Sequence, residues 1–83
     1  MKELKKKALH LEPMLRIGKN GLTKGMIEEI TSQLKKKKLI KIKFLKAYIE
    51  GKDRKEEAKR LSMLTKSQLV DITGNVLVLY KEK

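Results

Sequence analysis

The chain has 83 residues, of which 22 are Lys or Arg and 10 are Asp or Glu, so its formal net charge is +12. This length predicts one small domain, residues 1–83, with no large cleft between two domains. The absence of cysteine excludes disulfides, thiolate metal sites and a cysteine nucleophile, and no apolar stretch approaches the roughly 18 residues of a membrane span. We therefore expect a basic cytoplasmic domain whose partner is a polyanion.

The positive charge is concentrated in the first half of the chain. Residues 1–46 carry 14 basic and 4 acidic residues, a net charge of +10, whereas residues 47–83 carry a net charge of +2. Enrichment in Lys and Glu is common in heat-stable proteins, but that trend adds both signs of charge. The shortage of acids in the first half instead favours a polyanion-binding surface there.

A helix and a short strand are expected at the start of the chain. One apolar stripe at helical spacing runs along residues 2–12, and Pro13 disfavours its continuation. Residues 14–17 are a strand candidate that Gly18 ends.

The clearest helix in the sequence begins after Thr23, which occupies the N-cap position. Ile27, Ile30 and Leu34 share its apolar face. The lysine run at residues 35–38 lies at its C-terminal end, which suits the helix macrodipole.

A strand and a further helix come next. Residues 39–44 alternate between apolar and lysine side chains, which is typical of a half-buried strand, and residues 47–52 are expected to be a connection with some helical turn. Asp53 and Glu56 have the spacing of an acidic capping box and predict a new helix. The apolar stripe of that helix consists of Ala58, Leu61 and Leu64.

Two strands joined by a hairpin end the chain. Val70 and Ile72 belong to the first, Gly74–Asn75 is a two-residue turn, and the second strand, Val76 to Tyr80, is apolar at every position. The second strand is therefore expected to be central in the sheet or covered on both faces. The whole order predicts an α/β sandwich of two or three layers with a mixed four-stranded sheet, in which two strand–helix–strand units form parallel pairs.

The loop Gly18-Lys19-Asn20-Gly21 is the strongest candidate for a binding site. Its glycines allow a sharp turn, and it leads into a helix N-terminus whose free N–H groups can bind a phosphate. Lys19 and Lys24 add positive charge there, and Asn20 can hydrogen-bond to a phosphate, a sugar or a base. An ordinary strand-to-helix turn also needs glycines, so this motif alone leaves both interpretations open.

Four motifs occur in order along the chain: LHLEP at residues 9–13, IGKNGLT at 17–23, LIKIK at 39–43 and ITGNVLVLYK at 72–81. Together they resemble the signatures of the CRM domain (chloroplast RNA splicing and ribosome maturation) in its stand-alone prokaryotic, YhbY-like form. The resemblance covers about residues 2–82. It implies a fold similar to the C-terminal domain of translation initiation factor three, RNA binding, and association with precursors of the large ribosomal subunit.

The resemblance also assigns candidate contacts. The RNA-contacting loop of the family maps onto residues 18–21, and its closing Leu-Tyr-Arg corresponds to residues 79–81, where a lysine keeps the charge but lacks the bidentate fork of arginine. Lys41 and Lys43 project from one strand face, either as a ridge that follows phosphates or as a solvated face. The expected RNA-binding residues are Gly18, Lys19, Asn20, Gly21, Lys24, Lys41, Lys43 and Lys81.

Other residues carry weaker signals. His10 has no acid or nucleophile beside it in any recognisable motif, so packing or capping at the end of the first helix is expected. Tyr48 is the best candidate for stacking on a base, while Phe44 is expected in the core. No catalytic residue, metal site or cofactor is expected.

The sequence thus predicts a monomeric RNA-binding protein that acts in assembly of the large ribosomal subunit, with no membrane and no small-molecule substrate as partner. A small basic DNA-binding protein is the alternative, although no helix-turn-helix or zinc module is recognisable. An enzyme would need a carboxylate cluster for magnesium or a nucleophile–base pair, and neither is recognisable in the sequence.

Overall fold

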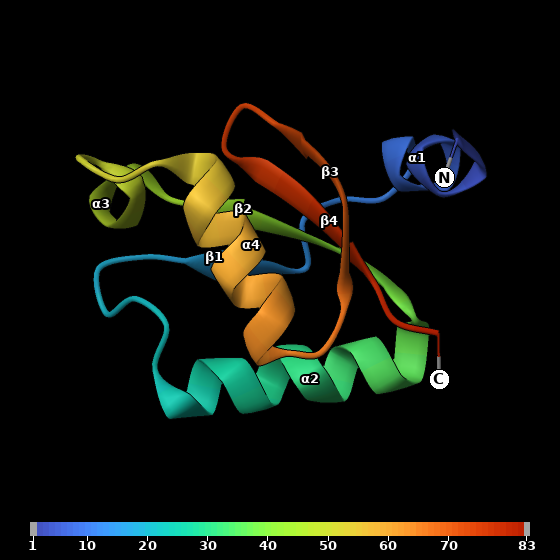
Figure 1. Ribbon diagram of the computed structural model, residues 1–83, viewed down its shortest axis with the longest axis horizontal. Helices are drawn as coiled ribbons and strands as arrows, with labels where there is room; N and C mark the ends of the chain where they lie inside the picture. The colour runs from blue at the N-terminus through green and yellow to red at the C-terminus, as the bar shows by residue number, and fades with distance from the viewer. Residues whose placement is uncertain (1, 83) are drawn as a thin grey trace.

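The computed structural model describes residues 2–82, which form a mixed sheet of four strands with helices on both of its faces (Figure 1). The expected order of elements is confirmed, and the connection after the second strand contains one short helix. The helices are α1 (Lys2–Leu9), α2 (Lys24–Lys37), α3 (Lys46–Ile49) and α4 (Arg54–Leu64). The strands are β1 (Leu15–Ile17), β2 (Leu39–Phe44), β3 (Gln68–Thr73) and β4 (Val76–Tyr80).

The strands lie in the order β1-β2-β4-β3. β1 and β2 are parallel, and β4 is antiparallel to both of its neighbours. The prediction of two parallel pairs is therefore wrong for the second unit, because β4 lies between β2 and β3. The expected central position of β4 is confirmed, and it has a physical reason: a strand that is apolar at every position is best buried where both faces are covered. Gly74, at φ +59°, forms the expected turn of the β3–β4 hairpin.

The main core lies on the face of the sheet that α2, α3 and α4 cover. Ala58 and Leu61 of α4 are fully buried there. The sequence predicts Leu64 on the same stripe, but its side chain is 48% exposed because the helix ends at this residue. Thr65 is buried instead, and its Oγ1 donates a hydrogen bond to the carbonyl of Leu61 (2.9 Å).

Both predicted N-caps are confirmed. The Oγ1 of Thr23 accepts a hydrogen bond from the N–H of Met26 (3.1 Å) at the start of α2. The carboxylate of Asp53 accepts from the N–H groups of Lys55 (2.9 Å) and Glu56 (3.4 Å) at the start of α4. These bonds satisfy donors that a helix leaves free, so the two caps determine where α2 and α4 begin.

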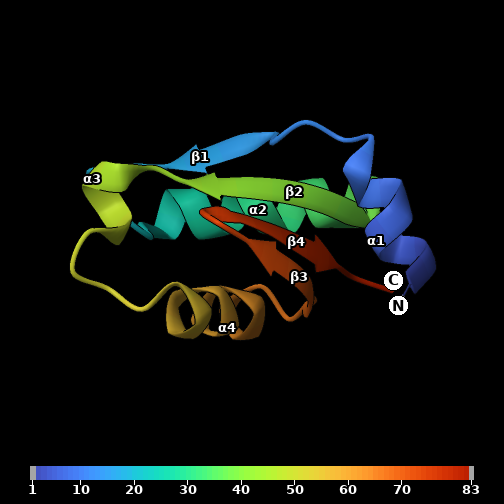
Figure 2. The ribbon, with the colours of Figure 1, turned by 90° about the horizontal axis from the view of Figure 1, so that it is seen from above.

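α1 covers part of the opposite face and forms a second, smaller core with the sheet. Ala8, Val70 and Val78 are buried in this core. α1 lies near the end of the sheet where β4 finishes (Figures 1 and 2). The helix ends at Leu9, three residues before the predicted end, and the chain reaches β1 as an extended segment.

β3 contains a β-bulge that the sequence pattern does not predict. Its register with β4 shifts between Leu69 and Asp71, so Val70 is one extra residue on β3. As a result Leu69 and Ile72 both pack against the main core, while Val70 packs with Ala8 on the opposite face. Val70 and Ile72, two positions apart, therefore lie on different faces.

Within residues 2–82, no helix is both long enough and apolar enough to cross a membrane.

Candidate nucleic-acid interface

The loop between β1 and α2 is a tight turn with two exposed residues at its tip. The N–H of Gly21 donates a hydrogen bond to the carbonyl of Gly18 (2.8 Å), which closes a four-residue turn. Lys19 and Asn20 occupy its two central positions and are exposed. The parallel pairing of Ile17 with Phe44 places this loop at the same edge of the sheet as the end of β2.

Both glycines lie against residues at the start of α3, and Gly21 also has a positive φ that favours glycine. Gly21 has φ +69°, and a Cβ added to it would lie 3.4 Å from Cε1 of Tyr48. A Cβ added to Gly18 would lie 3.2 Å from Cδ1 of Leu45. Because the loop rests directly on these two side chains, its backbone is held in one shape before any ligand binds.

Tyr48 supports the loop from below and is not a stacking surface for a base. Its side chain is only 6% exposed, its hydroxyl donates a hydrogen bond to the carboxylate of Glu57, and its ring lies 5.4 Å from that of Phe44. The ammonium of Lys52 lies 4.7 Å from the ring centroid and donates to the Tyr48 carbonyl (2.8 Å). Burial, with the hydrogen bond to Glu57, raises the pKa of Tyr48 to about 12. The expectation that Tyr48 stacks on a base is therefore wrong.

The first turn of α2 offers backbone donors beside the loop. The N–H of Met26 is bound to Thr23, but the N–H groups of Lys24 and Gly25 donate to no protein acceptor within residues 2–82. Lys24 is exposed, so its ammonium and these donors are available to an anion together.

Lys46 lies beside this loop, although it is not among the contacts that the sequence predicts. It is exposed, begins α3, and directly follows Leu45, which contacts Gly18. Among the described residues, the ion pairs are Lys5–Asp71 (3.9 Å) and Arg60–Glu57 (3.8 Å), so none involves Lys19, Lys24 or Lys46. The parallel pairing of β1 with β2, which the sequence predicts, brings Lys46 to the loop and is the signal that identifies it.

The two predicted lysines on β2 lie in different surroundings. Lys43 is exposed, and its register partner on β1 is Arg16, which is also exposed and was not among the predicted contacts. Lys41 instead reaches back to α1, where its Nζ donates hydrogen bonds to the carbonyls of Ala8 and Leu11 (both 3.2 Å). Lys41 thus fixes the C-terminal end of α1 to the sheet.

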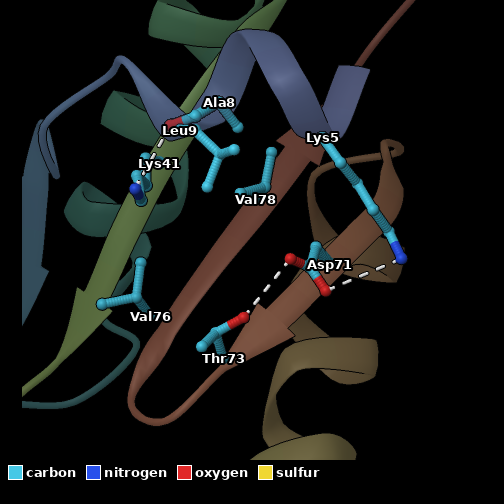
Figure 3. Close-up of a pocket in the computed structure, with 8 residues that line it drawn as sticks. All are labelled: Lys5, Ala8, Leu9, Lys41, Asp71, Thr73, Val76 and Val78. Atoms are coloured by element: carbon cyan, nitrogen blue, oxygen red, sulfur yellow. Dashed lines mark hydrogen bonds and ion pairs between the residues drawn. The ribbon is translucent and has the colours of Figure 1, made fainter. Parts of the chain in front are cut away.

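A shallow pocket lies between α1 and the sheet (Figure 3). On one side Asp71 accepts a hydrogen bond from the Thr73 hydroxyl (3.3 Å) and pairs with Lys5, and on the other Lys41 holds the end of α1. Leu9, 76% exposed, forms part of the wall. The pocket contains one acid and two lysines. Lys5 is paired with Asp71 and the Lys41 ammonium donates to two carbonyls, so both cations already have protein partners.

Lys81 lies at the opposite end of the sheet from the loop. Its backbone N–H donates to the carbonyl of Lys38 (2.8 Å), next to the end of α2. The molecule is 32 Å long along its longest axis, and the loop and the end of β4, which Lys81 follows, lie toward opposite ends of that axis (Figure 1). The predicted residues therefore divide into three places: the loop with Lys24, the sheet face with Lys41 and Lys43, and the far end with Lys81.

His10 and possible metal ligands are the remaining groups to place. His10 is exposed in the turn after α1, where its backbone N–H donates a hydrogen bond to the Lys7 carbonyl (3.2 Å). No group of three or more His, Cys, Asp or Glu within residues 2–82 could hold a metal ion.

Comparison with known proteins identifies the family of the chain. The chain matches the CRS1 / YhbY (CRM) domain over residues 1–81. It is 40% identical over 79 residues to "Probable RNA-binding protein YqeI" of Bacillus subtilis, covering 95% of this chain and 80% of that protein. It is 38% identical over 80 residues to "Probable RNA-binding protein MJ0652" of Methanocaldococcus jannaschii, covering 96% of this chain but only 59% of that longer protein.

A solved structure extends the agreement to the fold. The solution structure of the hypothetical protein SAV1595 from Staphylococcus aureus matches this one with a TM-score of 0.81 at 35% sequence identity, covering 99% of this chain and 83% of the other. Sequence motifs, fold and relatives lead to the same assignment: the chain belongs to the CRS1 / YhbY (CRM) domain family.

Proposed function

We propose that this protein binds RNA through the loop of residues 18–21 and the lysines around it. The observation that carries the proposal is the loop itself, in which exposed Lys19 and Asn20 stand at the tip of a preformed turn beside free N–H groups of α2. The net charge of +12 supports a polyanion as ligand. The names of the relatives from Bacillus subtilis and Methanocaldococcus jannaschii support RNA as that polyanion.

Binding proceeds in two physical stages. The lysine excess first attracts the phosphate backbone at long range and releases counterions, without reading sequence. The loop then clamps phosphates, because its backbone packs against α3 and the exposed lysines Lys19 and Lys24 lie in the loop and directly after it. Recognition is therefore mainly of backbone and shape, which is how proteins read structured RNA.

The biological setting that we propose is assembly of the large ribosomal subunit, with precursor ribosomal RNA as the ligand. The four ordered motifs of the family support it. The protein acts there in the cytoplasm as a monomeric binding protein and not as an enzyme. Co-sedimentation with precursor large-subunit particles, followed by cross-linking and mapping of the contacted RNA, tests this setting directly. Absence from those particles would contradict it while leaving RNA binding intact.

The RNA-binding proposal is tested by affinity at several salt concentrations. If about 5 phosphates are neutralised, the slope of log K against log salt is expected between about −3.5 and −4.5. A slope near zero contradicts the electrostatic account. Competition by duplex DNA at one salt concentration supplies the second arm: equal competition by DNA and structured RNA would favour a general DNA-binding protein.

A further inference from the structure

A groove between α1 and the C-terminal end of α2 is the second basic feature of the molecule, and the loop does not use it. We name it the α1–α2 groove. It is lined by Leu4, Lys7, Leu11, Lys37, Lys38, Leu39 and Tyr80. The elements that line it, α1 and the C-terminal end of α2, lie at the end of the sheet opposite the loop of residues 18–21 (Figure 1).

The lining combines two kinds of chemistry. Lys7, Lys37 and Lys38 are exposed, no acidic residue lines the groove, and the ion pairs within residues 2–82 involve none of these lysines. Between them lie apolar side chains, with Leu39 and Tyr80 as direct partners across the β2–β4 ladder. Tyr80 is partly buried: it packs against the smaller core and also lines the groove.

Helix electrostatics alone does not account for this arrangement. The macrodipole favours lysines in the last turn of α2, which explains Lys35 and Lys36 as well as Lys37. The macrodipole of α1 favours Lys7 in its last turn in the same way. It does not explain why the C-terminal ends of two helices lie together over an open apolar floor. Lys38 is held in the left-handed region at φ +65°, a conformation that glycine adopts more readily, and its carbonyl is fixed by the N–H of Lys81.

We propose that the α1–α2 groove binds one unpaired nucleotide of the RNA ligand, with the base against Tyr80 and the neighbouring phosphates on Lys7, Lys37 and Lys38. The inference rests on the proposed RNA-binding function and adds a second contact to it. Three ammonium groups without a carboxylate complement phosphates, and an aromatic floor complements the face of a base. A base offers that face only when it is not stacked in a duplex, so the groove selects a bulge, a loop or a single-stranded end.

The experiment uses an RNA hairpin that carries one unpaired 2-aminopurine, whose fluorescence falls when it stacks. Wild type and Tyr80→Phe are expected to quench it on binding, because both keep the ring. Tyr80→Leu keeps apolar volume but removes the ring, so it is expected to lose the quenching and about tenfold in affinity. Quenching by Tyr80→Leu equal to wild type would overturn the assignment of the base.

The phosphate contacts are tested by two double variants with the same change in charge. Lys37→Glu/Lys38→Glu removes two lysines of the groove, whereas Lys35→Glu/Lys36→Glu changes neighbouring lysines of the same helix that do not line it. The groove pair is expected to bind at least tenfold more weakly than the control pair and to make the salt slope shallower by about 1.4, which is two single-strand phosphate contacts. Equal losses in the two pairs would mean bulk charge only and would overturn the proposal.

The experiments distinguish failure of the groove proposal from failure of the proposed RNA-binding function. If wild type binds no RNA, both proposals are rejected. If wild type binds and the groove variants match their controls, only the groove is rejected. Two results together would point to a protein ligand and overturn the assignment to a nucleotide. In the first, an acidic peptide displaces the fluorescent hairpin from wild type and equally from the loop variant Lys19→Glu. In the second, a fully paired hairpin binds as tightly as the hairpin with the unpaired base.

Discussion

The two ends of the sheet present positive charge in different ways. At one end, the loop of residues 18–21 offers few charges but a fixed backbone, because Gly18 and Gly21 rest on Leu45 and Tyr48. At the other end, the lysines of residues 35–38 are numerous, exposed and carried on flexible side chains. Fixed donors lose little entropy on binding, whereas four-carbon lysine stems lose more, so the first arrangement favours defined contacts and the second favours attraction.

The difference shows that net charge and binding site are separate properties of a basic protein. The sum of +12 predicts how strongly RNA is attracted, but the positions of backbone donors decide where a phosphate is held. Each variant below alters one end of the sheet and leaves the other as an internal reference.

The largest effect is expected from reversing charge at the loop. Lys19→Glu/Lys24→Glu is expected to weaken RNA binding by about 3 kcal/mol, because two charge-assisted contacts are lost. Lys55→Glu/Lys59→Glu on α4 changes the net charge equally and leaves the loop intact, so a much smaller loss is expected. Binding affinity at fixed salt distinguishes the two variants. Equal losses would show that RNA responds to total charge and that the loop has no special role.

A second comparison separates loop shape from backbone strain. Gly21→Val is expected to lower the free energy of unfolding by about 2 kcal/mol, because a β-branched residue is forced to positive φ. Gly51, at φ +80°, has no atom within 4 Å of an added Cβ, so Gly51→Val carries similar strain without the contact to Tyr48. Denaturant unfolding measures both variants, and only Gly21→Val is expected to weaken RNA binding as well. A binding defect in Gly51→Val would contradict the role of the loop.

Much of the fold follows from the sequence because its signals are local. Thr23 and Asp53 each cap a helix, and the alternation of residues 39–44 gives β2 at its full length. The strand order does not follow from local signals, because the position of β4 between β2 and β3 depends on burial across the whole sheet. The bulge at Val70 is likewise a property of two paired strands and leaves no pattern in either one.

The sequence predicts the loop of the candidate site but not the residues that surround it. Spacing of glycines locates the loop, but only the tertiary fold places Tyr48 beneath Gly21. Lys41 illustrates the same limit: alternation places it correctly on the strand face, but its hydrogen bonds to α1 join residues about thirty positions apart. Such contacts have no period in the sequence.

A smaller effect is expected from the tyrosine under the loop. Tyr48→Phe is expected to cost about 1.5 kcal/mol of stability at pH 8, because the hydrogen bond to the Glu57 carboxylate is lost. The pKa of Tyr48 is raised from 10.0 to about 12 in the folded protein, so the folded state holds this proton more tightly than the unfolded chain. The stabilisation is therefore complete below pH 10 and is lost as the pH rises through 12.

The measurement is the difference in unfolding free energy between wild type and Tyr48→Phe across this pH range. Subtracting the variant removes the titration of the lysines, which both proteins share. A difference that stays constant from pH 9 to pH 12 would contradict the raised pKa of Tyr48. This variant should still quench the 2-aminopurine of the fluorescent hairpin on binding, because Tyr80 at the far end of the sheet is unchanged.

The smallest effect is expected where Lys41 fixes the end of α1 to the sheet. Lys41→Met is expected to destabilise the protein by about 1 kcal/mol, because the carbonyls of Ala8 and Leu11 lose their shared donor while the apolar stem is kept. Lys43→Met is the control, since its exposed ammonium holds no such contact, and a change within about 0.5 kcal/mol is expected. Hydrogen exchange should show faster opening of α1 in Lys41→Met alone.

Because α1 supplies Lys7 to the α1–α2 groove but nothing to the loop, loosening it should weaken contacts at the groove and leave those at the loop unchanged. Equal loss at both ends would mean that the sheet behaves as one binding surface.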